Sequence, residues 1–167
     1  MAMADDPLTT LAARLGTLLT QRGWTLALAE SCTGGMASQY ITAVPGSSSC
    51  FERGFVTYSN SAKIELLGVS AETLERCGAV SEETAREMAK GALEHSHVQL
   101  TGAITGVAGP DGGTPDKPVG MVCFAWAGPD AALHSETHYF DGDRDAIRRQ
   151  SVETIYKGLL RLANGST

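Results

Sequence analysis

The sequence predicts a three-layer α/β/α domain around a mixed β-sheet, and two observations predict it. Helical and strand patterns alternate in the first part of the chain, whereas three strand patterns follow one another between about residues 100 and 140. Alternation favours parallel strands covered by helices, and the late hairpin-like strands add antiparallel pairing. The chain has 167 residues, 43% of them hydrophobic, and fits a single domain at residues 1–167 with a sizeable core.

Start and stop signals set the bounds of the expected elements. Asp6 followed by Pro7 is typical of a helix start, and so is Ser81 followed by two acids. The nearly continuous apolar run at 24–29 is typical of a strand covered on both faces, and Pro45 ends the helix that follows it. In chain order we expect a helix at about 7–21, a strand at 24–29, a helix at about 34–44, a strand at 51–58, a short helix that contains Lys63, Leu66 and Leu67, a helix from Ser81, strands at 100–108, 119–127 and 133–140, and a helix at about 144–163.

Composition and charge restrict the class of function. A net charge of −6 argues against a broad nucleic-acid surface, because phosphate contacts need clustered Lys and Arg. No run approaches the roughly 18 apolar residues that span a bilayer, and the acidic start does not resemble a secretory signal. The four cysteines form no CxxC pair and the four histidines form no HExxH order. We therefore expect a cytoplasmic protein that needs no metal or other cofactor and binds neither nucleic acid nor membrane.

Ser31 lies at the expected junction between the first strand and the second helix, in the run AESCTGG. Free backbone N–H groups at a helix N-terminus can stabilise an oxyanion or bind a phosphate. Ser31 is therefore a candidate nucleophile, and the amides of Thr33, Gly34 and Gly35 are candidate oxyanion donors. Two alternatives stay open: Ser31 or Thr33 is only a helix cap, or Cys32 is the nucleophile.

A serine nucleophile needs a base, and Lys63 is the candidate. A lysine is protonated at neutral pH unless burial or nearby cations lower its pKa. Tyr58 precedes Lys63 by five residues across a polar segment, so a strand end and the next helix could place phenol and amine in one cleft. There the tyrosine could relay a proton or orient the lysine. The alternative is a solvated helix lysine and an ordinary strand aromatic.

Two further segments are candidates for substrate contact. Residues 105–114 are rich in glycine, which lets a planar ligand or a phosphate approach the backbone, although a long tight connection would also need glycine. The order of these glycines matches neither the dinucleotide motif nor the Walker motif. Arg144 and Arg148 lie one turn apart at the start of the last helix, where either a bound phosphate or pairing with the aspartates in 141–145 would account for them.

Five sequence blocks occur in order between about Leu8 and Ala163: AESCTGG, GFVTYSNSAKIELLGV, GAVSEETAREMAKGALEHS, AITGVAGPDGGTPDKPVGMV and GDRDAIRRQSV. Together they resemble the CinA C-terminal-domain family, which includes stand-alone nicotinamide-nucleotide amidohydrolases. The resemblance implies an anticodon-binding-domain-like sandwich with a mixed, mostly parallel five-stranded sheet. It also implies hydrolysis of the carboxamide of nicotinamide mononucleotide (NMN) to nicotinic acid mononucleotide and ammonia, a step in pyridine-nucleotide recycling.

The same resemblance assigns roles to individual residues. The family's catalytic serine, tyrosine and lysine fall on Ser31, Tyr58 and Lys63. Its substrate-side loop falls on Thr105, Gly106, Gly109, Gly112 and Gly113. The resemblance also implies a homo-oligomer. A competing hypothesis is a non-catalytic module that binds a nucleotide or a protein in competence or the DNA-damage response, but the intact set of three catalytic residues favours the enzyme.

Overall fold

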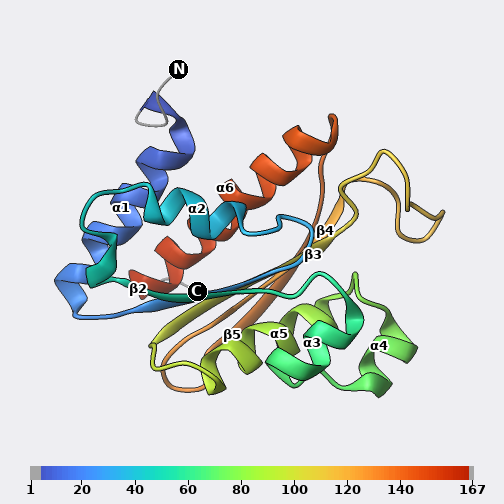
Figure 1. The fold of residues 1–167 in the computed structure, drawn as a ribbon, viewed down its shortest axis with the longest axis horizontal. Helices are drawn as coiled ribbons and strands as arrows, with labels where there is room; N and C mark the ends of the chain where they lie inside the picture. Colours follow the sequence, from blue (N-terminus) through green and yellow to red (C-terminus); the bar gives the residue numbers. More distant parts are fainter. Residues whose placement is uncertain (1–4, 166–167) are drawn as a thin grey trace.

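A computed structural model of the chain describes residues 5–165 as a five-stranded sheet between two layers of helices (Figure 1). The predicted three-layer architecture is therefore confirmed. In chain order the elements are α1 (Pro7–Arg22), β1 (Leu26–Glu30), α2 (Met36–Thr42), the short 3-10 helix η2 (Ser47–Ser49), β2 (Phe51–Val56), α3 (Asn60–Leu67), α4 (Ala71–Cys77), α5 (Glu82–Glu94), β3 (Leu100–Gly106), β4 (Met121–Ala127), β5 (Leu133–Tyr139) and α6 (Arg144–Ala163).

The strands lie in the order β2-β1-β3-β4-β5. Strand β1 pairs in parallel with both β2 and β3, whereas β4 runs antiparallel to its neighbours β3 and β5. Four strands therefore run in one direction and only β4 is reversed, which confirms a mixed, mostly parallel sheet. The carboxyl ends of β1, β2 and β3 consequently meet at one edge, on the side from which the long β3–β4 connection projects in Figure 1. In open α/β sheets this edge is where ligands bind.

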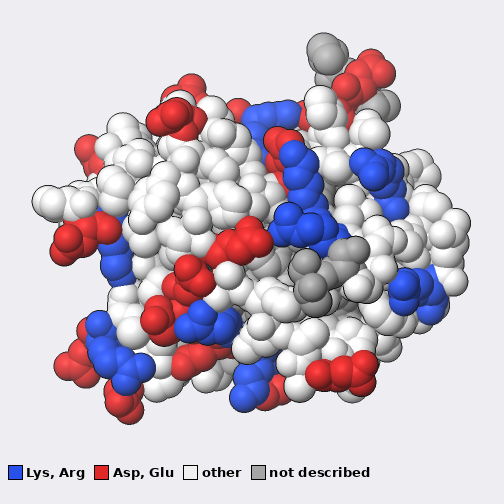
Figure 2. All heavy atoms as spheres, turned by 180° about the vertical axis from the view of Figure 1, so that it is seen from behind, with Lys and Arg blue, Asp and Glu red and all other residues white. Residues whose placement is uncertain are grey.

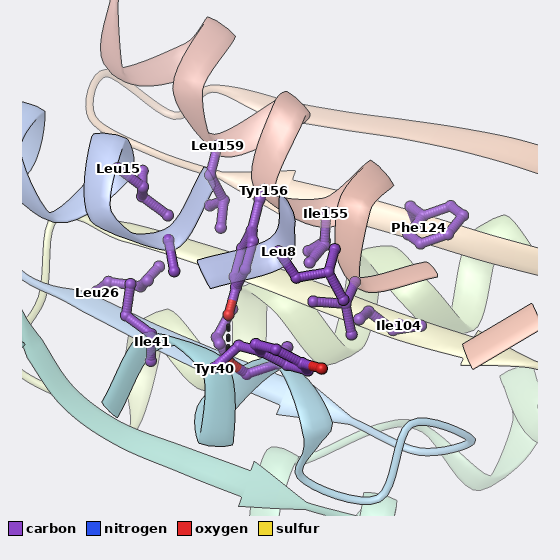
Figure 3. Packing of buried hydrophobic residues seen from close by; sticks show 14 of the residues in the cluster. Leu8, Leu15, Leu26, Tyr40, Ile41, Ile104, Phe124, Ile155, Tyr156 and Leu159 are labelled. Atoms are coloured by element: carbon purple, nitrogen blue, oxygen red, sulfur yellow. Dashed lines mark hydrogen bonds between the residues drawn. The ribbon is translucent and has the colours of Figure 1, made fainter. Parts of the chain in front are cut away.

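Each face of the sheet has its own apolar cluster. Helices α1, α2 and α6 cover one face, and α3, α4 and α5 cover the other (Figure 1). On the first face, Tyr156 of α6 stands among the packed side chains of Figure 3, and its hydroxyl donates to the backbone carbonyl of Ala37. This hydrogen bond fixes the first turn of α2, directly after the Ser31 segment, against α6.

The surface mixes charges of both signs. On the face shown in Figure 2, basic and acidic side chains lie interspersed around wide areas that carry no charge. Ion pairs such as Lys157 with Glu153 and Arg161 with Glu136 are part of this pattern. Among the described helices, none is long and apolar enough to cross a membrane.

The structure also differs from the sequence prediction in several elements. Helix α4 was not predicted, because its seven residues bury only Thr73 and Leu74 and so carry little apolar periodicity. Strand β4 begins two residues later than expected. The reason is Gly120, which has a positive φ of 94° and lies so close to the Phe140 carbonyl that a side chain there would clash with it. Strand β2 ends at Val56, so that the expected strand residue Tyr58 lies in the following loop.

Asp6 joins the start of α1 to α6. Its carboxylate accepts hydrogen bonds from the backbone N–H of Leu8 at 3.0 Å, from the Tyr40 hydroxyl at 2.9 Å and from Arg149 at 2.8 and 2.9 Å. The hydrogen bond from Arg149 lowers the pKa of Asp6 from 3.8 to about 2. Asp6 therefore stabilises the fold fully above its ordinary pKa, and this contribution is lost as the pH falls toward 2.

We predict that Asp6→Asn lowers the free energy of unfolding at pH 7 by about 1–2 kcal/mol, because asparagine still caps the helix but loses the charge-assisted hydrogen bonds from Arg149. Between about pH 4 and pH 2, the wild-type chain should lose more stability than the variant, because only the wild type has a carboxylate to protonate. Urea unfolding at pH 7, 4 and 2.5 measures both effects. Parallel pH dependences would show that Asp6 is not a stabilising carboxylate.

Candidate active site

Ser31 and Lys63 meet at the carboxyl edge of the sheet. Ser31 directly follows β1, and Lys63 lies in the first turns of α3, whose N-cap Ser59 accepts a hydrogen bond from the backbone N–H of Ala62. The distance from Lys63 Nζ to Ser31 Oγ is 3.1 Å. Both residues are buried, with exposed fractions of 1% for Lys63 and 8% for Ser31. The structure thus brings the candidate base within hydrogen-bonding distance of the candidate nucleophile.

The amine of Lys63 has only neutral partners among the described residues. Besides Ser31, its Nζ donates to the backbone carbonyls of Thr57 at 2.8 Å and Tyr58 at 3.4 Å. Burial lowers the pKa of Lys63 below its ordinary value, since a desolvated ammonium is less stable than a desolvated amine. A neutral amine has a lone pair with which to accept the Ser31 proton.

Cys32 is a poor competitor for the role of nucleophile. Its side chain packs in the apolar cluster under α1, α2 and α6, on the face of the sheet opposite α3 and Lys63. Burial raises the pKa of its thiol to about 12, so that the reactive thiolate is scarce at neutral pH.

Glu30 organises the turn that carries Ser31. Its buried carboxylate accepts four hydrogen bonds, two from backbone N–H groups at the start of α2 and two from hydroxyls. The donors are Ala37 N at 2.9 Å, Ser38 N at 3.0 Å, Ser38 Oγ at 2.7 Å and Thr33 Oγ1 at 2.7 Å. Glu30 was not among the predicted site residues, although an acid at the end of a buried strand that leads into a helix N-terminus is the signal that could have found it.

The backbone of the Ser31 turn presents free N–H groups. Gly34 and Gly35 have positive φ values of 57° and 99°. The N–H of Gly34 donates to the Ser31 carbonyl at 3.0 Å, so it is engaged within the turn. Within residues 5–165, by contrast, the N–H groups of Thr33 and Gly35 have no hydrogen-bond acceptor. These two amides are available to a developing negative charge beside Ser31 Oγ.

Tyr58 reaches the site from its mouth. Its side chain is 62% exposed, and its hydroxyl accepts a hydrogen bond from Arg144 Nη2 at 3.1 Å. Tyr58 accepts a hydrogen bond from Lys63 through its backbone carbonyl, and within residues 5–165 no hydrogen bond joins its phenol to Lys63. Arg144 also donates from Nη1 to the carbonyl of Gly109 at 2.8 Å. One guanidinium therefore joins α6, the glycine-rich loop and the segment that follows β2.

Arg148 lies one turn further along α6 and faces the Ser31 turn. Its guanidinium donates to the carbonyls of Cys32 at 3.2 Å and Thr33 at 3.0 Å. Within the part of the chain that the structure describes, neither Arg144 nor Arg148 pairs with an aspartate, which was the alternative to anion binding. Arg149, in contrast, is occupied by Asp6.

The glycine-rich connection is packed tightly beside the site. Thr105 is buried and donates to the carbonyl of Ala79 at 2.7 Å. A Cβ on Gly106 would lie 2.9 Å from the Met121 carbonyl, and one on Gly113 would lie 2.8 Å from the backbone N of Val119. Gly109 and Gly112 have positive φ values of 77° and 88°. Much of the glycine content is therefore explained by backbone packing, while the Gly109 carbonyl reaches the site through Arg144.

Within residues 5–165, no group of three or more His, Cys, Asp or Glu side chains could hold a metal ion.

Comparison with known proteins agrees with this architecture and places the chain in a family. A family model described as the CinA C-terminal domain matches residues 8–163. The chain belongs to this family. Its members include proteins named nicotinamide-nucleotide amidohydrolase PncC. The one from Pseudomonas putida is 50% identical over 94% of this chain and 98% of its own length, and the one from Escherichia coli K12 is 47% identical over 95% and 99%.

Longer proteins of the CinA family and solved structures match as well. A CinA-like protein of Chlorobaculum tepidum is 51% identical over 86% of this chain, which spans only 35% of that relative's length. The crystal structure of the competence/damage inducible protein CihA from Agrobacterium tumefaciens is 42% identical, with a TM-score of 0.93 over 97% of this chain and 99% of that one. A CinA superfamily protein from Escherichia coli has a TM-score of 0.89 at 36% identity, over 97% and 94%.

We predict that Glu30→Gln lowers the free energy of unfolding by about 2 kcal/mol. The glutamine side chain keeps the shape of the carboxylate, but it has one acceptor oxygen where glutamate has two. Some of the four N–H and O–H groups that donate to Glu30 therefore lose their acceptor. Urea unfolding measures the loss, and Ser38→Ala, which removes a single hydroxyl donor, should cost about 1 kcal/mol. An unchanged unfolding midpoint for Glu30→Gln would show that the four hydrogen bonds do not stabilise the turn.

Proposed function

We propose that this chain hydrolyses the carboxamide of NMN to nicotinic acid mononucleotide and ammonia, a reaction of pyridine-nucleotide recycling. The observation that carries this proposal is the buried pair of Ser31 Oγ and Lys63 Nζ, 3.1 Å apart. The relatives from Pseudomonas putida and Escherichia coli, which align over nearly their whole length, are named for action on nicotinamide nucleotides. Location in the cytoplasm and assembly into a homo-oligomer stay predictions.

The first step in this mechanism is the attack of Ser31 on the carboxamide. Neutral Lys63 takes the proton of Ser31 Oγ as the oxygen forms a bond to the carboxamide carbon. The electron pair of the carbonyl moves to its oxygen, beside the free N–H groups of Thr33 and Gly35. The amide of Gly34 serves the turn itself, because it already donates to the Ser31 carbonyl.

The second step releases ammonia and then the acid. The Lys63 ammonium donates its proton to the departing nitrogen, and water then hydrolyses the ester on Ser31 with Lys63 again accepting a proton. Tyr58 is the second candidate for the proton donor and for substrate contact, since its hydroxyl lies at the mouth of the site with Arg144. We assign the phosphate of NMN to Arg144 and Arg148, whose guanidinium groups contact the Gly109 carbonyl of the glycine-rich loop and the Thr33 carbonyl of the Ser31 turn.

Replacement of Ser31 by Ala should abolish ammonia release from NMN while the fold is retained, because Ser31 Oγ has no structural partner other than Lys63 among the described residues. Purified Ser31→Ala and Cys32→Ser are compared by a coupled ammonia assay, with circular dichroism to check folding. Cys32→Ser should keep most of the turnover. Equal loss of activity in both variants would mean that the wrong neighbour is assigned as nucleophile.

Lys63→Arg and Lys63→Met should both lower kcat/KM by about 10²–10⁴-fold, the usual contribution of a general base. Arginine stays protonated and cannot accept the Ser31 proton, whereas methionine lacks the amine. In the wild type, kcat/KM should rise with pH to a plateau, because Lys63 acts deprotonated and its pKa lies below 10.5. Calorimetry should show that Lys63→Met still binds NMN. Near-normal turnover of Lys63→Arg with an unchanged pH profile would exclude lysine as the base.

Removal of a cation at the mouth should weaken the binding of the phosphate. Arg144→Ala is expected to raise KM for NMN by roughly tenfold, which corresponds to the loss of one charge-assisted hydrogen bond. The riboside that lacks the phosphate is the comparison substrate, and its kcat/KM should change little. Arg161→Ala is the matched control, since Arg161 lies in the last turn of the same helix and pairs with Glu136. Equal losses of kcat/KM for both substrates would show that Arg144 does not bind the phosphate.

A further inference from the structure

Thr57 carries a hydroxyl that the fold itself does not use. Among the residues that the structure describes, Thr57 Oγ1 is the only buried side-chain nitrogen or oxygen atom without a hydrogen-bond partner. Thr57 is completely buried. A buried hydroxyl without a partner destabilises a fold, so its presence calls for another explanation, such as a role in function.

The backbone of Thr57 lies between the two residues of the catalytic pair. Its N–H donates to the carbonyl of Glu30 at 2.8 Å, directly before Ser31, and its own carbonyl accepts the Lys63 amine at 2.8 Å. The parallel pairing of β1 and β2 sets this position, because Glu30 lies opposite Val56 in the ladder. Thr57 is thus the neighbour of Ser31 on the adjacent chain segment.

The Thr57 side chain lies on the same face of the sheet as Ser31. Phe55 and Ala29 both belong to the apolar cluster beneath α3, α4 and α5. Two residues further along each extended segment, Thr57 and Ser31 return to that face by strand alternation. This is also the face from which α3 delivers Lys63. The unpartnered hydroxyl therefore shares an enclosed environment with the nucleophile and the amine.

A count of hydrogens on Lys63 shows what the resting site lacks. If the amine is neutral, its two N–H groups can donate to the carbonyls of Thr57 and Tyr58, which leaves its lone pair for the Ser31 hydroxyl at 3.1 Å. After the Ser31 proton moves to Lys63, the ammonium has three N–H groups. Ser31 Oγ is by then bonded to carbon and is a weaker acceptor. One N–H of a buried ammonium would be left without a good partner.

We propose that Thr57 is a positioning residue whose hydroxyl accepts this third N–H of the Lys63 ammonium. The contact forms as Ser31 Oγ gives its proton to Lys63 and bonds to the acyl carbon. It holds the ammonium until the proton passes to the departing nitrogen, so that no proton is gained or lost. The inference rests on the Ser31–Lys63 chemistry of the proposed function, but it does not require that the acyl group come from NMN.

The test compares three variants of the full chain. Thr57→Val removes the hydroxyl at nearly constant shape, and Thr57→Ser keeps it. Thr101→Val is the matched control, because Thr101 is a buried threonine of β3 whose hydroxyl is satisfied by the Ala89 carbonyl at 2.8 Å. Phosphonylation of Ser31 by a fluorophosphonate, in which Ser31 Oγ displaces fluoride, is followed by mass spectrometry across pH. Ammonia release from NMN and thermal melting are measured in parallel.

We expect Thr57→Val to lower the plateau rate of Ser31 phosphonylation by roughly tenfold or more, the effect of one hydrogen bond to a charged group. The rising limb of its pH profile should stay where it is in the wild type, because in the free enzyme the three N–H groups of the ammonium already have Ser31 Oγ and the carbonyls of Thr57 and Tyr58 as acceptors. Its melting temperature should equal or exceed that of the wild type, since an unpaired hydroxyl has been replaced by a methyl group. Thr57→Ser should recover most of the rate but melt lower, and Thr101→Val should melt lower with an unchanged rate.

Three results would overturn the inference. A Thr57→Val profile identical to that of the wild type would mean that the hydroxyl has no role. A rising limb shifted to higher pH would mean that water has entered and solvated Lys63, which is a structural effect. If Ser31 of the wild-type protein is not phosphonylated, Ser31 is not a nucleophile and both proposals fail. If phosphonylation responds as expected but NMN yields no ammonia, only the proposed substrate fails.

Discussion

The burial of the Lys63 amine against Ser31 is the constraint on which the site depends. An isolated ammonium is costly to bury, and within the described residues Lys63 has no carboxylate partner to offset that cost. The fold tolerates the residue because the amine can be neutral and because the carbonyls of Thr57 and Tyr58 accept its hydrogens. The same burial that disfavours the ammonium makes the amine a base for the nearby hydroxyl. Stability and chemistry therefore both favour the neutral form of this one nitrogen atom.

The sheet topology allows these demands to be met by short-range contacts. Because β1, β2 and β3 are parallel, their following segments lie side by side, and Ser31 and Thr57 become neighbours although 26 positions separate them in the sequence. Glu30 then accepts the N–H groups at the start of α2, and within the described part of the chain the N–H groups of Thr33 and Gly35 in the Ser31 turn have no acceptor. Arg144 and Arg148 bring α6 to the same edge from the end of the chain. The architecture thus collects a nucleophile, a base, amide donors and two cations from three segments, which are the Ser31 turn, α3 and α6.

Local signals in the sequence were sufficient for the architecture and for part of the site. The caps at Asp6 and Ser81 and the apolar run before Ser31 fixed the main elements, since such patterns depend on nearby residues. The resemblance assigned roles to Ser31, Tyr58 and Lys63, but the direction of the Tyr58 phenol depends on Arg144, which is 86 residues away. The lack of a hydrogen-bond partner for the Thr57 hydroxyl likewise depends on strand register and on which polar groups the fold brings within reach of it. No pattern of adjacent residues carries that information.

Titration of Lys63 measures directly whether its amine loses its proton more readily in the folded protein than an exposed lysine does. Protein labelled with ¹³C at the lysine ε-carbons is titrated by NMR from pH 6 to 11.5, and the signal absent from Lys63→Met identifies Lys63. The account predicts a pKa below the ordinary value of 10.5, in the direction set by desolvation. A Lys63 signal that titrates at or above 10.5 in the folded protein would contradict it.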